Sequence, residues 1–424
     1  MMILFAALLA LLFLGVFAYL QHPKFGAYPE GRRLEKVERS PHYVNGSFRN
    51  LVDTPVLREG VSMGSIMVGN LLEKVANLRP SMPLPTVKTD LKALELERDA
   101  IVWLGHSSYF VIFAGQRMLI DPVLSSHAAP VSFSTQAFAG TNLYTVEELP
   151  SIDVLLITHD HWDHLDHATV TALQDKVSQA LVPLGVGAHL EHWGYPPEKI
   201  READWYDRLP LDAKATLHLI PARHYSGRLL TRNMTLWTGF VLESATRRIL
   251  FSGDTGYGPH FTEIAQRFGS FDLVALDMGQ YDPRWPYIHM TPEEAAQAAK
   301  DLNAKALLPA HVGRFSIARH AWNEPFERIR AASQSQPYRL LTPMIGRPSS
   351  WKTKNLPSHP GGSQELLHPD PQLPSTLQEH LHESHWITSV RWPRGSTNCR
   401  IAHASPDGRS GAGEGARRRH QPGG

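Results

Sequence analysis

Short apolar runs that end in polar residues recur through the middle of the chain. Runs such as AIVWLG at 100–105 and IDVLLI at 152–157 predict buried β-strands. Similar runs occupy 109–123, 215–225, 236–244, 247–256, 271–279 and 305–313. Helical patterns lie between them at 168–177, 261–269 and 291–302. The alternation of strands and helices predicts an α/β domain over 96–346.

The last of these helices has a clear start signal. Thr291 stands at the expected N-cap, and Glu294 follows three residues later, which is the pattern of a capping box. We therefore expect the helix to begin immediately after Thr291.

The chain begins with an uncharged apolar run over residues 3–20. This length is enough for one membrane-spanning helix, and we assign residues 1–20 as a membrane anchor. A cleaved signal peptide is the alternative, although no charged residue precedes the run and no clean A-x-A site follows it. Basic residues follow the run and none precedes it, so the positive-inside rule favours a cytoplasmic-facing domain.

Two segments flank the α/β domain. Residues 21–95 mix prolines, charges and short apolar runs, including a helical pattern at 62–78, and we expect an N-terminal extension that packs on the domain. Residues 347–424 are rich in Pro, Gly, Ser and His and have few periodic apolar positions. This composition predicts a disordered tail.

Composition narrows the class of protein. The 424 residues carry a formal charge of +1, which provides no basic footprint for a nucleic acid. The single cysteine, Cys399, excludes an intramolecular disulfide and a multi-thiolate metal site. The oligomeric state is left open, and a homodimer is compatible with the sequence.

The densest polar cluster, THDHWDHLDH at 158–167, directly follows an apolar run. His159 and His161 face the same side of an extended chain, whereas Asp163 and His164 can turn toward a second point. Imidazole and carboxylate are the ligands that zinc takes in open hydrolytic sites. A polar loop with coincidental histidines is the alternative, and four histidines within ten positions argue against it.

Three later apolar runs end in further candidate ligands, His224, Asp254 and His311. Taken singly, a histidine at a strand end is more often a hydrogen-bonded loop residue. In this order after HxHxDH, however, the three complete a set of seven ligands for two metal ions. Asp254 is the residue able to bridge both ions, with one carboxylate oxygen for each.

HxHxDH, a strand-end His, GDTG and another strand-end His together resemble the metallo-β-lactamase superfamily. More narrowly, the chain resembles the N-acyl-phosphatidylethanolamine-hydrolysing phospholipase D branch of this superfamily and the bacterial relatives of that branch. The motifs that carry this narrower resemblance are WLGHSSYF, LIDPVLSSHAAP, VPLG, YDPRW and HMTPEEA. The resemblance covers roughly 100–330. It implies an αββα sandwich with metals at one rim of the two sheets.

The resemblance also implies a ligand set. His159, His161 and His224 would hold one Zn2+, and Asp163, His164 and His311 the second, with Asp254 between them. Mn2+ or Fe2+ are alternatives to zinc. Two such ions lower the pKa of a shared water toward about 7, so that a metal-bridging hydroxide can attack a phosphodiester.

Further residues are assigned roles around this centre. Asp163, Asp254 and His289 are expected to be catalytic, and His289 is also expected to contact substrate. Arg284 and Trp285 in YDPRW are expected to meet the phosphate and an acyl or glycerol group, although Trp285 could simply pack on its loop.

Three more residues are candidates for supporting the ligands. Asp166 is expected to hydrogen-bond a ligand imidazole. For His106 and Asp121, an ordinary turn is an equal alternative. Asp277 and Gln280 are more polar than the branch pattern leads us to expect, which predicts an altered pocket preference.

These features predict a membrane-anchored binuclear zinc phosphodiesterase of the phospholipase D type, acting on N-acyl-phosphatidylethanolamine-like phospholipids. One alternative is a lactonase or phosphodiesterase of a small soluble metabolite, for which a small polar pocket would be expected. A non-catalytic metal-stabilised binding module is the other, and the complete set of seven ligands argues against it.

Overall fold

The computed structural model describes residues 2–228 and 231–349. The predicted tail lies outside the described residues from residue 350 onward. Its first residues belong to the fold, because Pro348 and Ser349 form strand β16 and pair antiparallel with Val102 and Ile101. The expected domain boundary at residue 346 therefore falls a few residues too early.

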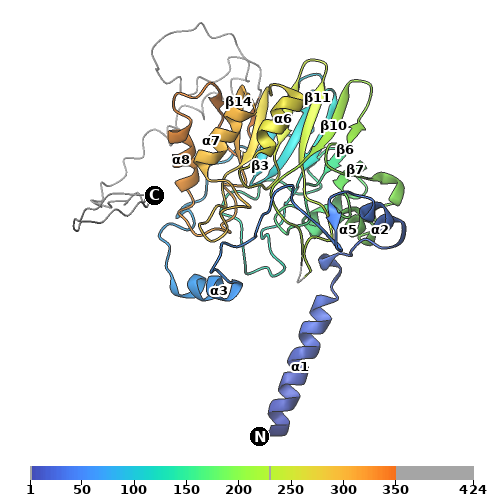
Figure 1. Ribbon diagram of the computed structural model, residues 1–424, viewed down its shortest axis with the longest axis vertical. Coiled ribbons are helices and arrows are strands. Elements are labelled where there is room, and N and C mark those ends of the chain that lie inside the picture. Colours follow the sequence, from blue (N-terminus) through green and yellow to red (C-terminus); the bar gives the residue numbers. More distant parts are fainter. Residues whose placement is uncertain (1, 229–230, 350–424) are drawn as a thin grey trace, which may run out of the picture. The chain divides into compact units, whose positions relative to one another are not determined.

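Two seven-stranded sheets form a sandwich (Figure 1). The first sheet contains, in spatial order, β16 (Pro348–Ser349), β3 (Ala100–Gly105), β4 (Ser108–Phe113), β5 (Gln116–Ile120), β6 (Ile152–Leu156), β7 (Val177–Pro183) and β8 (Ile200–Ala203). The second contains β15 (Arg339–Leu340), β14 (Ala306–Ala310), β13 (Leu273–Asp277), β12 (Arg248–Phe251), β11 (Gly239–Ser244), β10 (Ala215–Ile220) and β9 (Arg208–Pro210). Each predicted run contains a strand, whereas β7, β8 and the short edge strands β9, β15 and β16 lie outside the predicted runs.

Both sheets change from antiparallel to parallel pairing at one strand. In the first sheet, pairing is antiparallel from β16 to β5 and parallel from β5 to β8. In the second, it is antiparallel from β9 to β12 and parallel from β12 to β15. Strands β3, β5 and β6 thus end at one edge of the first sheet, and β10, β12, β13 and β14 at one edge of the second.

Alternation along the strands separates two cores. Leu156 of β6 packs in the core shared by the two sheets, whereas its neighbour Leu155 packs in a core on the outer face of the first sheet. That outer core also receives Val170 of α4 (His167–Leu173) and Leu190 of α5 (Gly187–His192).

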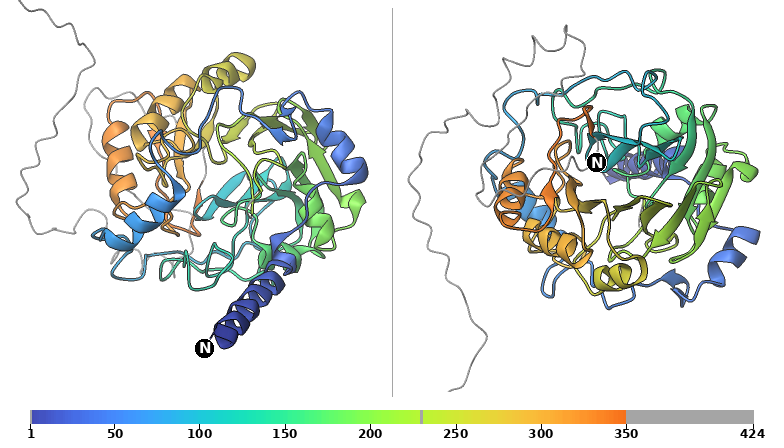
Figure 2. Two further views of the ribbon diagram at one scale, coloured as in Figure 1. Left: turned by 60° about the horizontal axis from the view of Figure 1, so that its bottom comes forward. Right: turned by 90° about the horizontal axis from the view of Figure 1, so that it is seen from above.

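The second sheet is covered by three helices, α6 (His260–Phe268), α7 (Pro292–Asp301) and α8 (Glu324–Ala332). They lie together on one side of the strands, drawn yellow to orange (Figure 2), and α7 packs against α6, α8, β13 and β14. The capping box predicted for α7 is confirmed, since Thr291 and Glu294 bond each other's backbone N–H groups.

The N-terminal part contains α1 (Met2–Leu20), α2 (Gly31–Glu38), a hairpin of β1 (Tyr43–Val44) and β2 (Ser47–Phe48), and α3 (Met63–Leu72); two short 3-10 helices, Pro23–Phe25 and Pro197–Lys199, complete the elements. Val37 and Phe48 join Trp205 and Trp237 in a small core, so the extension packs on the α/β domain.

No residue of α1 is buried. Its length and composition would let it cross a membrane, a property that signal sequences share.

Candidate metal centre

The candidate residues follow the carboxyl ends of strands that point the same way within each sheet. These residues are His106 after β3, Asp121 after β5, His159 and His161 after β6, His224 after β10, Asp254 after β12, Asp277 at the end of β13 and His311 after β14. In open α/β sheets, ligands bind beyond such strand ends, where loops rather than paired backbone present the side chains. The sandwich therefore gathers side chains from both sheets at one rim.

The first cluster consists of His159, His161, His224 and Asp254, whose ligand atoms lie within 4.8 Å of one another. Nδ1 of His161 lies 2.9 Å from Nε2 of His159 and 3.2 Å from Nε2 of His224. Oδ2 of Asp254 lies 3.8 Å from Nε2 of His159 and 3.7 Å from Nε2 of His224. Three ring nitrogens and one carboxylate oxygen thus converge on a single point.

The second cluster consists of His106, Asp163, His164 and His311. Oδ2 of Asp163 lies 3.0 Å from Nε2 of His311 and 3.6 Å from Nε2 of His164. Asp254 reaches this cluster as well, because its Oδ1 lies 3.1 Å from Nε2 of His164. Its Oδ2 also lies 3.4 Å from Nε2 of His311, so Asp254 stands between the two clusters.

These distances suit divalent cations. Two ligands at roughly 2.0–2.1 Å from one tetrahedral zinc lie roughly 3–3.5 Å apart, close to the spacing in both clusters. Nε2 of His164 and Oδ1 of Asp254 are buried 3.1 Å from each other, and neither atom has a hydrogen-bond partner elsewhere among the described residues. Buried polar atoms without partners are rare, and a cation would satisfy both. All seven predicted ligands are brought together, and their binding of metal remains a prediction.

The first-cluster histidines are held neutral. Burial lowers the pKa of His159 and His224 well below the usual value, and it lowers the pKa of His161 to about 4. A neutral imidazole offers a lone pair to a metal, whereas an imidazolium does not. The three rings are thus ready to act as ligands at neutral pH.

In the second cluster, the negative charge of the aspartates determines the direction of the histidine pKa shifts. Burial lowers the pKa of His164 and His311, but the neighbouring aspartates outweigh it, so the pKa of His164 is raised well above the usual value and that of His311 to about 10. Burial raises the pKa of Asp163 and Asp254, but the histidines hold both pKa values well below the usual range. In the absence of metal, protons therefore occupy the place that cations would take.

Other carboxylates orient the histidines. Asp121 lies 2.8 Å from Nδ1 of His164 and accepts hydrogen bonds from the backbone and hydroxyl of Thr158. Asp277 is fully buried, with Oδ1 3.2 Å from Nδ1 of His311 and Oδ2 2.7 Å from Nδ1 of His289. Such partners fix the tautomer of a ligating imidazole and leave its Nε2 for the metal.

The backbone is strained at three of these positions. His106, Asp121 and His311 adopt left-handed conformations, with φ values of 55°, 42° and 59°. Non-glycine residues rarely do so, and such conformations collect at functional sites. Backbone bonds between His106 and Val312 and between His311 and His106 join the two loops across the sheets. The strained turns aim side chains from both sheets at the rim.

Comparison with known proteins identifies the family. Residues 116–312 match the model of the beta-lactamase superfamily domain. An uncharacterized protein of Mycobacterium tuberculosis is 38% identical over 314 residues, which cover 73% of this chain and 84% of that protein. The chain belongs to the metallo-β-lactamase superfamily.

Relatives within the superfamily include lipid hydrolases by name. N-acyl-phosphatidylethanolamine-hydrolyzing phospholipase D 1 of Caenorhabditis elegans is 30% identical over 54% of this chain and 68% of its own length. The mitochondrial enzyme of the same name from Saccharomyces cerevisiae is 32% identical over 55% of this chain and 51% of its own length. The chain is thus a metal-dependent hydrolase of the metallo-β-lactamase fold.

His289 connects this metallo-β-lactamase centre to a cleft of about 620 Å³. The walls of this His289 cleft come from 281–294, from 319–328 and from Val75 and Ala76 of the N-terminal extension. The His289 ring lies 5.0 Å from that of His224 and 4.9 Å from that of His311. His289 is therefore placed between the clusters and the space that a substrate could enter.

Three of the assigned residues have other partners within the described part of the chain, and the substrate contacts of Arg284 and Trp285 stay predictions. Asp166 contacts no predicted ligand, because its carboxylate accepts hydrogen bonds from the hydroxyls of Ser125 and Thr169 at the start of α4. The Arg284 guanidinium binds both oxygens of Asp282, at 2.8 and 2.6 Å, and so is already neutralised. The indole N–H of Trp285 donates to the carbonyl of Gln280, 3.0 Å away, as expected for packing on its loop.

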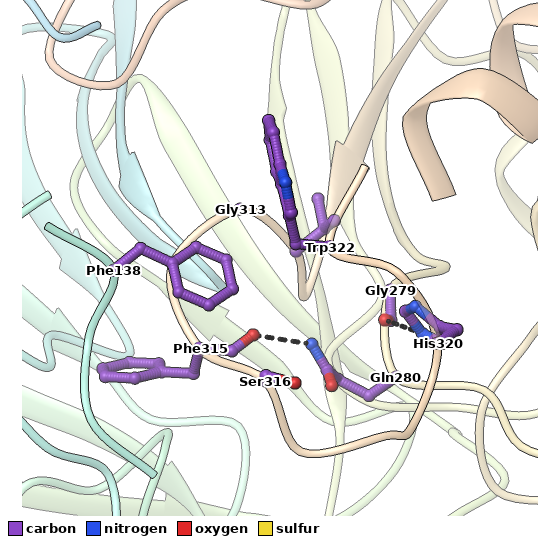
Figure 3. A pocket seen from close by; sticks show the side chains of 9 residues that line it. Phe138, Gly279, Gln280, Gly313, Phe315, Ser316, His320 and Trp322 are labelled. Atoms are coloured by element: carbon purple, nitrogen blue, oxygen red, sulfur yellow. Dashed lines mark hydrogen bonds between the residues drawn. The ribbon is translucent and has the colours of Figure 1, made fainter. Parts of the chain in front are cut away.

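Gln280 lines a small void and bonds the loop that follows His311, including the carbonyl of Phe315 (Figure 3). Its Nε2 donates to the carbonyls of His311 and Phe315, and its Oε1 accepts from the backbone of Ile317 and Ala318. The void beside it is about 10 Å³, room for one water at most. Gln280 therefore holds the loop that carries His311, and the altered pocket preference expected from Asp277 and Gln280 stays a prediction.

Two supporting residues were missed in the sequence. Asp277 was noted only as unexpectedly polar, although its place at a strand end is the signal that identified Asp254. Asp160, inside the histidine motif, is fully buried and accepts from the backbone of Gly227 and the hydroxyl of Thr235. Nothing in its spacing distinguishes it from a ligand, because its role depends on a segment 67 residues away.

Proposed function

We propose that this chain is a membrane-anchored, binuclear zinc phosphodiesterase of the phospholipase D type. Its substrates would be N-acyl-phosphatidylethanolamine-like phospholipids. The observation that carries the proposal is the position of Asp254 between the two clusters. Its Oδ1 faces His164, and its Oδ2 lies 3.4 Å from His311 and 3.7–3.8 Å from His224 and His159. A carboxylate placed between two donor sets suits a two-metal hydrolytic site.

Each cluster supplies a donor set for one ion. His159, His161 and His224 would hold one metal ion. Asp163, His164 and His311 would hold the other, and Asp254 would contact both ions. Nitrogen and carboxylate donors without thiolate suit zinc and also accept manganese or iron. When bound, such ions activate water and offset the charge that develops on a phosphate.

His289 would act on the substrate rather than on a metal. Burial raises the pKa of Asp277, but His289 and His311 outweigh it and hold that pKa below its usual value, so Asp277 is a carboxylate. It accepts a hydrogen bond from Nδ1–H of His289 at 2.7 Å. Nε2 of the neutral ring would then accept a proton or a hydrogen bond in the His289 cleft, and Nε2–H of the protonated ring would donate to a phosphate oxygen or to the leaving group.

Two apolar helices support a lipid substrate. Helix α1 consists of nineteen residues without a charge, which would anchor the enzyme in a bilayer. Helix α3 is also uncharged and leaves Met67, Val68 and Leu72 exposed, with 70%, 57% and 74% of their surface accessible. Such exposed apolar surface is unusual on a soluble domain and suits contact with acyl chains.

A hydrolase of a small soluble metabolite is the second candidate. The observation that favours it is the lining of the His289 cleft, where Asp282, Glu294, Glu324, Arg319 and Arg328 contribute charged groups. A polar cleft of this kind suits a headgroup or a soluble ester better than an acyl chain.

Product analysis separates the two candidates. Zinc-loaded full-length protein in mixed micelles with N-acyl-phosphatidylethanolamine should release phosphatidic acid and an N-acylethanolamine. Asp254→Asn should release neither, and Asp166→Asn, which alters a carboxylate outside the clusters, should behave as wild type. A wild-type protein that binds two metal ions per chain and leaves the lipid intact would exclude this substrate and favour soluble esters.

A further inference from the structure

We propose that Arg319 forms a subsite in the His289 cleft for a second anionic group of the substrate, a carboxylate or a phosphate on the headgroup side of the scissile bond. The inference rests on the proposed function in one respect, because it takes the His289 cleft as the place where the substrate headgroup binds.

The other charged groups of the cleft already have partners. Asp282 is bound by both arms of Arg284. Glu324 accepts a hydrogen bond from the hydroxyl of Tyr281 at 2.7 Å and lies 3.2 Å from Arg328. Arg328 also binds Glu293, so both arginines of these pairs are engaged by carboxylates and have little capacity left for an anion.

Glu294 is the remaining carboxylate of the lining. It accepts bonds from the backbone N–H and the hydroxyl of Thr291, at 2.8 and 3.0 Å. It belongs to the first turn of α7, where the helix dipole stabilises negative charge. Its charge is thus accounted for by the helix that it caps.

Arg319 differs from these residues. Within the part of the chain that the structure describes, its guanidinium bonds the backbone carbonyl of Glu73 and forms no ion pair, and its Nε is buried without a partner. A guanidinium carries five N–H donors arranged to bind a carboxylate or phosphate through two of them. Arg319 therefore brings uncompensated charge and unused donors to the wall of the cleft.

The loop that carries Arg319 is held in place from within. Gln280 accepts hydrogen bonds from the backbone of Ile317 and Ala318, at 2.9 and 2.8 Å, immediately before Arg319. The same side chain donates to the carbonyl of His311 at 3.2 Å. One glutamine thus ties the backbone of the proposed subsite to the backbone of a candidate metal ligand, which fixes the two relative to each other.

In this proposal the anion at Arg319 is distinct from the one that reacts. Arg319 and His289 line the same cleft, and only His289 is seen in contact with rings of the two clusters, those of His224 and His311. A phosphodiester held at the clusters would therefore extend past His289, and the group that reaches Arg319 would be a separate one. A free phosphate ion offers the same chemistry, and the experiment must distinguish the two sources.

Calorimetric binding to the zinc-loaded full-length protein tests the proposal. The probes are sn-glycero-3-phosphoserine and sn-glycero-3-phosphoethanolamine, which differ by one carboxylate, with inorganic phosphate as the free anion. We expect the wild type to bind the serine compound about tenfold more tightly, as one charge-assisted bidentate contact allows. Mass spectrometry of the recovered probes checks that neither is hydrolysed during the titration.

Two matched variants identify the residue responsible. Arg319→Gln should bind both probes equally, whereas Arg328→Gln, which removes a paired charge from the same cleft, should keep the preference. Arg319→Lys keeps the positive charge and should retain part of the preference for the serine probe. A graded loss from wild type through Arg319→Lys to Arg319→Gln would distinguish loss of the charge from a folding defect.

An unchanged preference in Arg319→Gln, or its absence from the wild type, would overturn the proposal. The proposal would also be overturned if Arg319→Gln weakened the binding of inorganic phosphate alone, because the site would then bind a free ion. The readout is binding, so it stands apart from any failure to detect lipid hydrolysis.

Discussion

At the scale of single residues, Asp277 has the most specific task. One buried carboxylate holds His311, a candidate ligand, and His289, the candidate substrate contact, through separate oxygens. In Asp277→Asn the side chain is uncharged and has only one acceptor oxygen. It can no longer accept a charge-assisted hydrogen bond from each of the two rings, so the rings lose their fixed orientation. We expect zinc affinity to fall about 10- to 100-fold, measured by competition with a chromogenic chelator.

Asp166→Asn is the control for that measurement. Asp166 contacts Ser125 and Thr169 but no histidine of the clusters, so zinc affinity should remain at the wild-type value. Equal affinities in Asp277→Asn and Asp166→Asn would show that Asp277 does not support the centre.

At the scale of elements, apolar runs were a reliable guide where they ended in distinctive residues. The strands that lead to His159, Asp254 and His311 were all predicted. β7 and β8 were missed because VSQALVP and IREA lack clear apolar-to-polar boundaries. They become strands by parallel pairing, β7 with β6 and β8 with β7. Tertiary pairing of this kind leaves no local signature.

Helix α7 provides a prediction at this scale. Its capping box satisfies two backbone donors at the helix start, immediately after the segment that carries His289. Thr291→Ala should lower the free energy of unfolding by about 1 kcal/mol, measured by urea denaturation, whereas Thr291→Ser should be nearly neutral. Equal losses in both variants would mean that the threonine methyl group, not the cap, stabilises this end.

Helix α1 provides a second prediction at the scale of elements. Because none of its residues is buried, removal of residues 2–18 should leave the fold intact and release the protein from membranes. Alkaline carbonate extraction should leave the full chain in the pellet and the shortened chain in the supernatant. A mature protein whose mass shows cleavage near residue 20 would identify a signal peptide and contradict the anchor.

At the scale of the whole molecule, two sheets with the same change of strand direction bring seven strand ends to one rim. Sequence order and the HxHxDH motif were enough to nominate the seven candidate ligands, because each follows an apolar strand. Arg284 and Trp285 could not be judged in the same way, since their partners, Asp282 and the Gln280 carbonyl, depend on how one loop folds back. Supporting residues are set by tertiary contacts.

The central claim is that this rim holds two divalent ions with Asp254 between them. The most direct test is the zinc content per chain of the full-length protein after loading and exhaustive dialysis, measured by mass spectrometry of the metal. The account predicts two ions for the wild type and for Asp166→Asn, and no more than one for Asp254→Asn. A folded wild type that retains one ion or none, or an Asp254→Asn variant that keeps both, would contradict it.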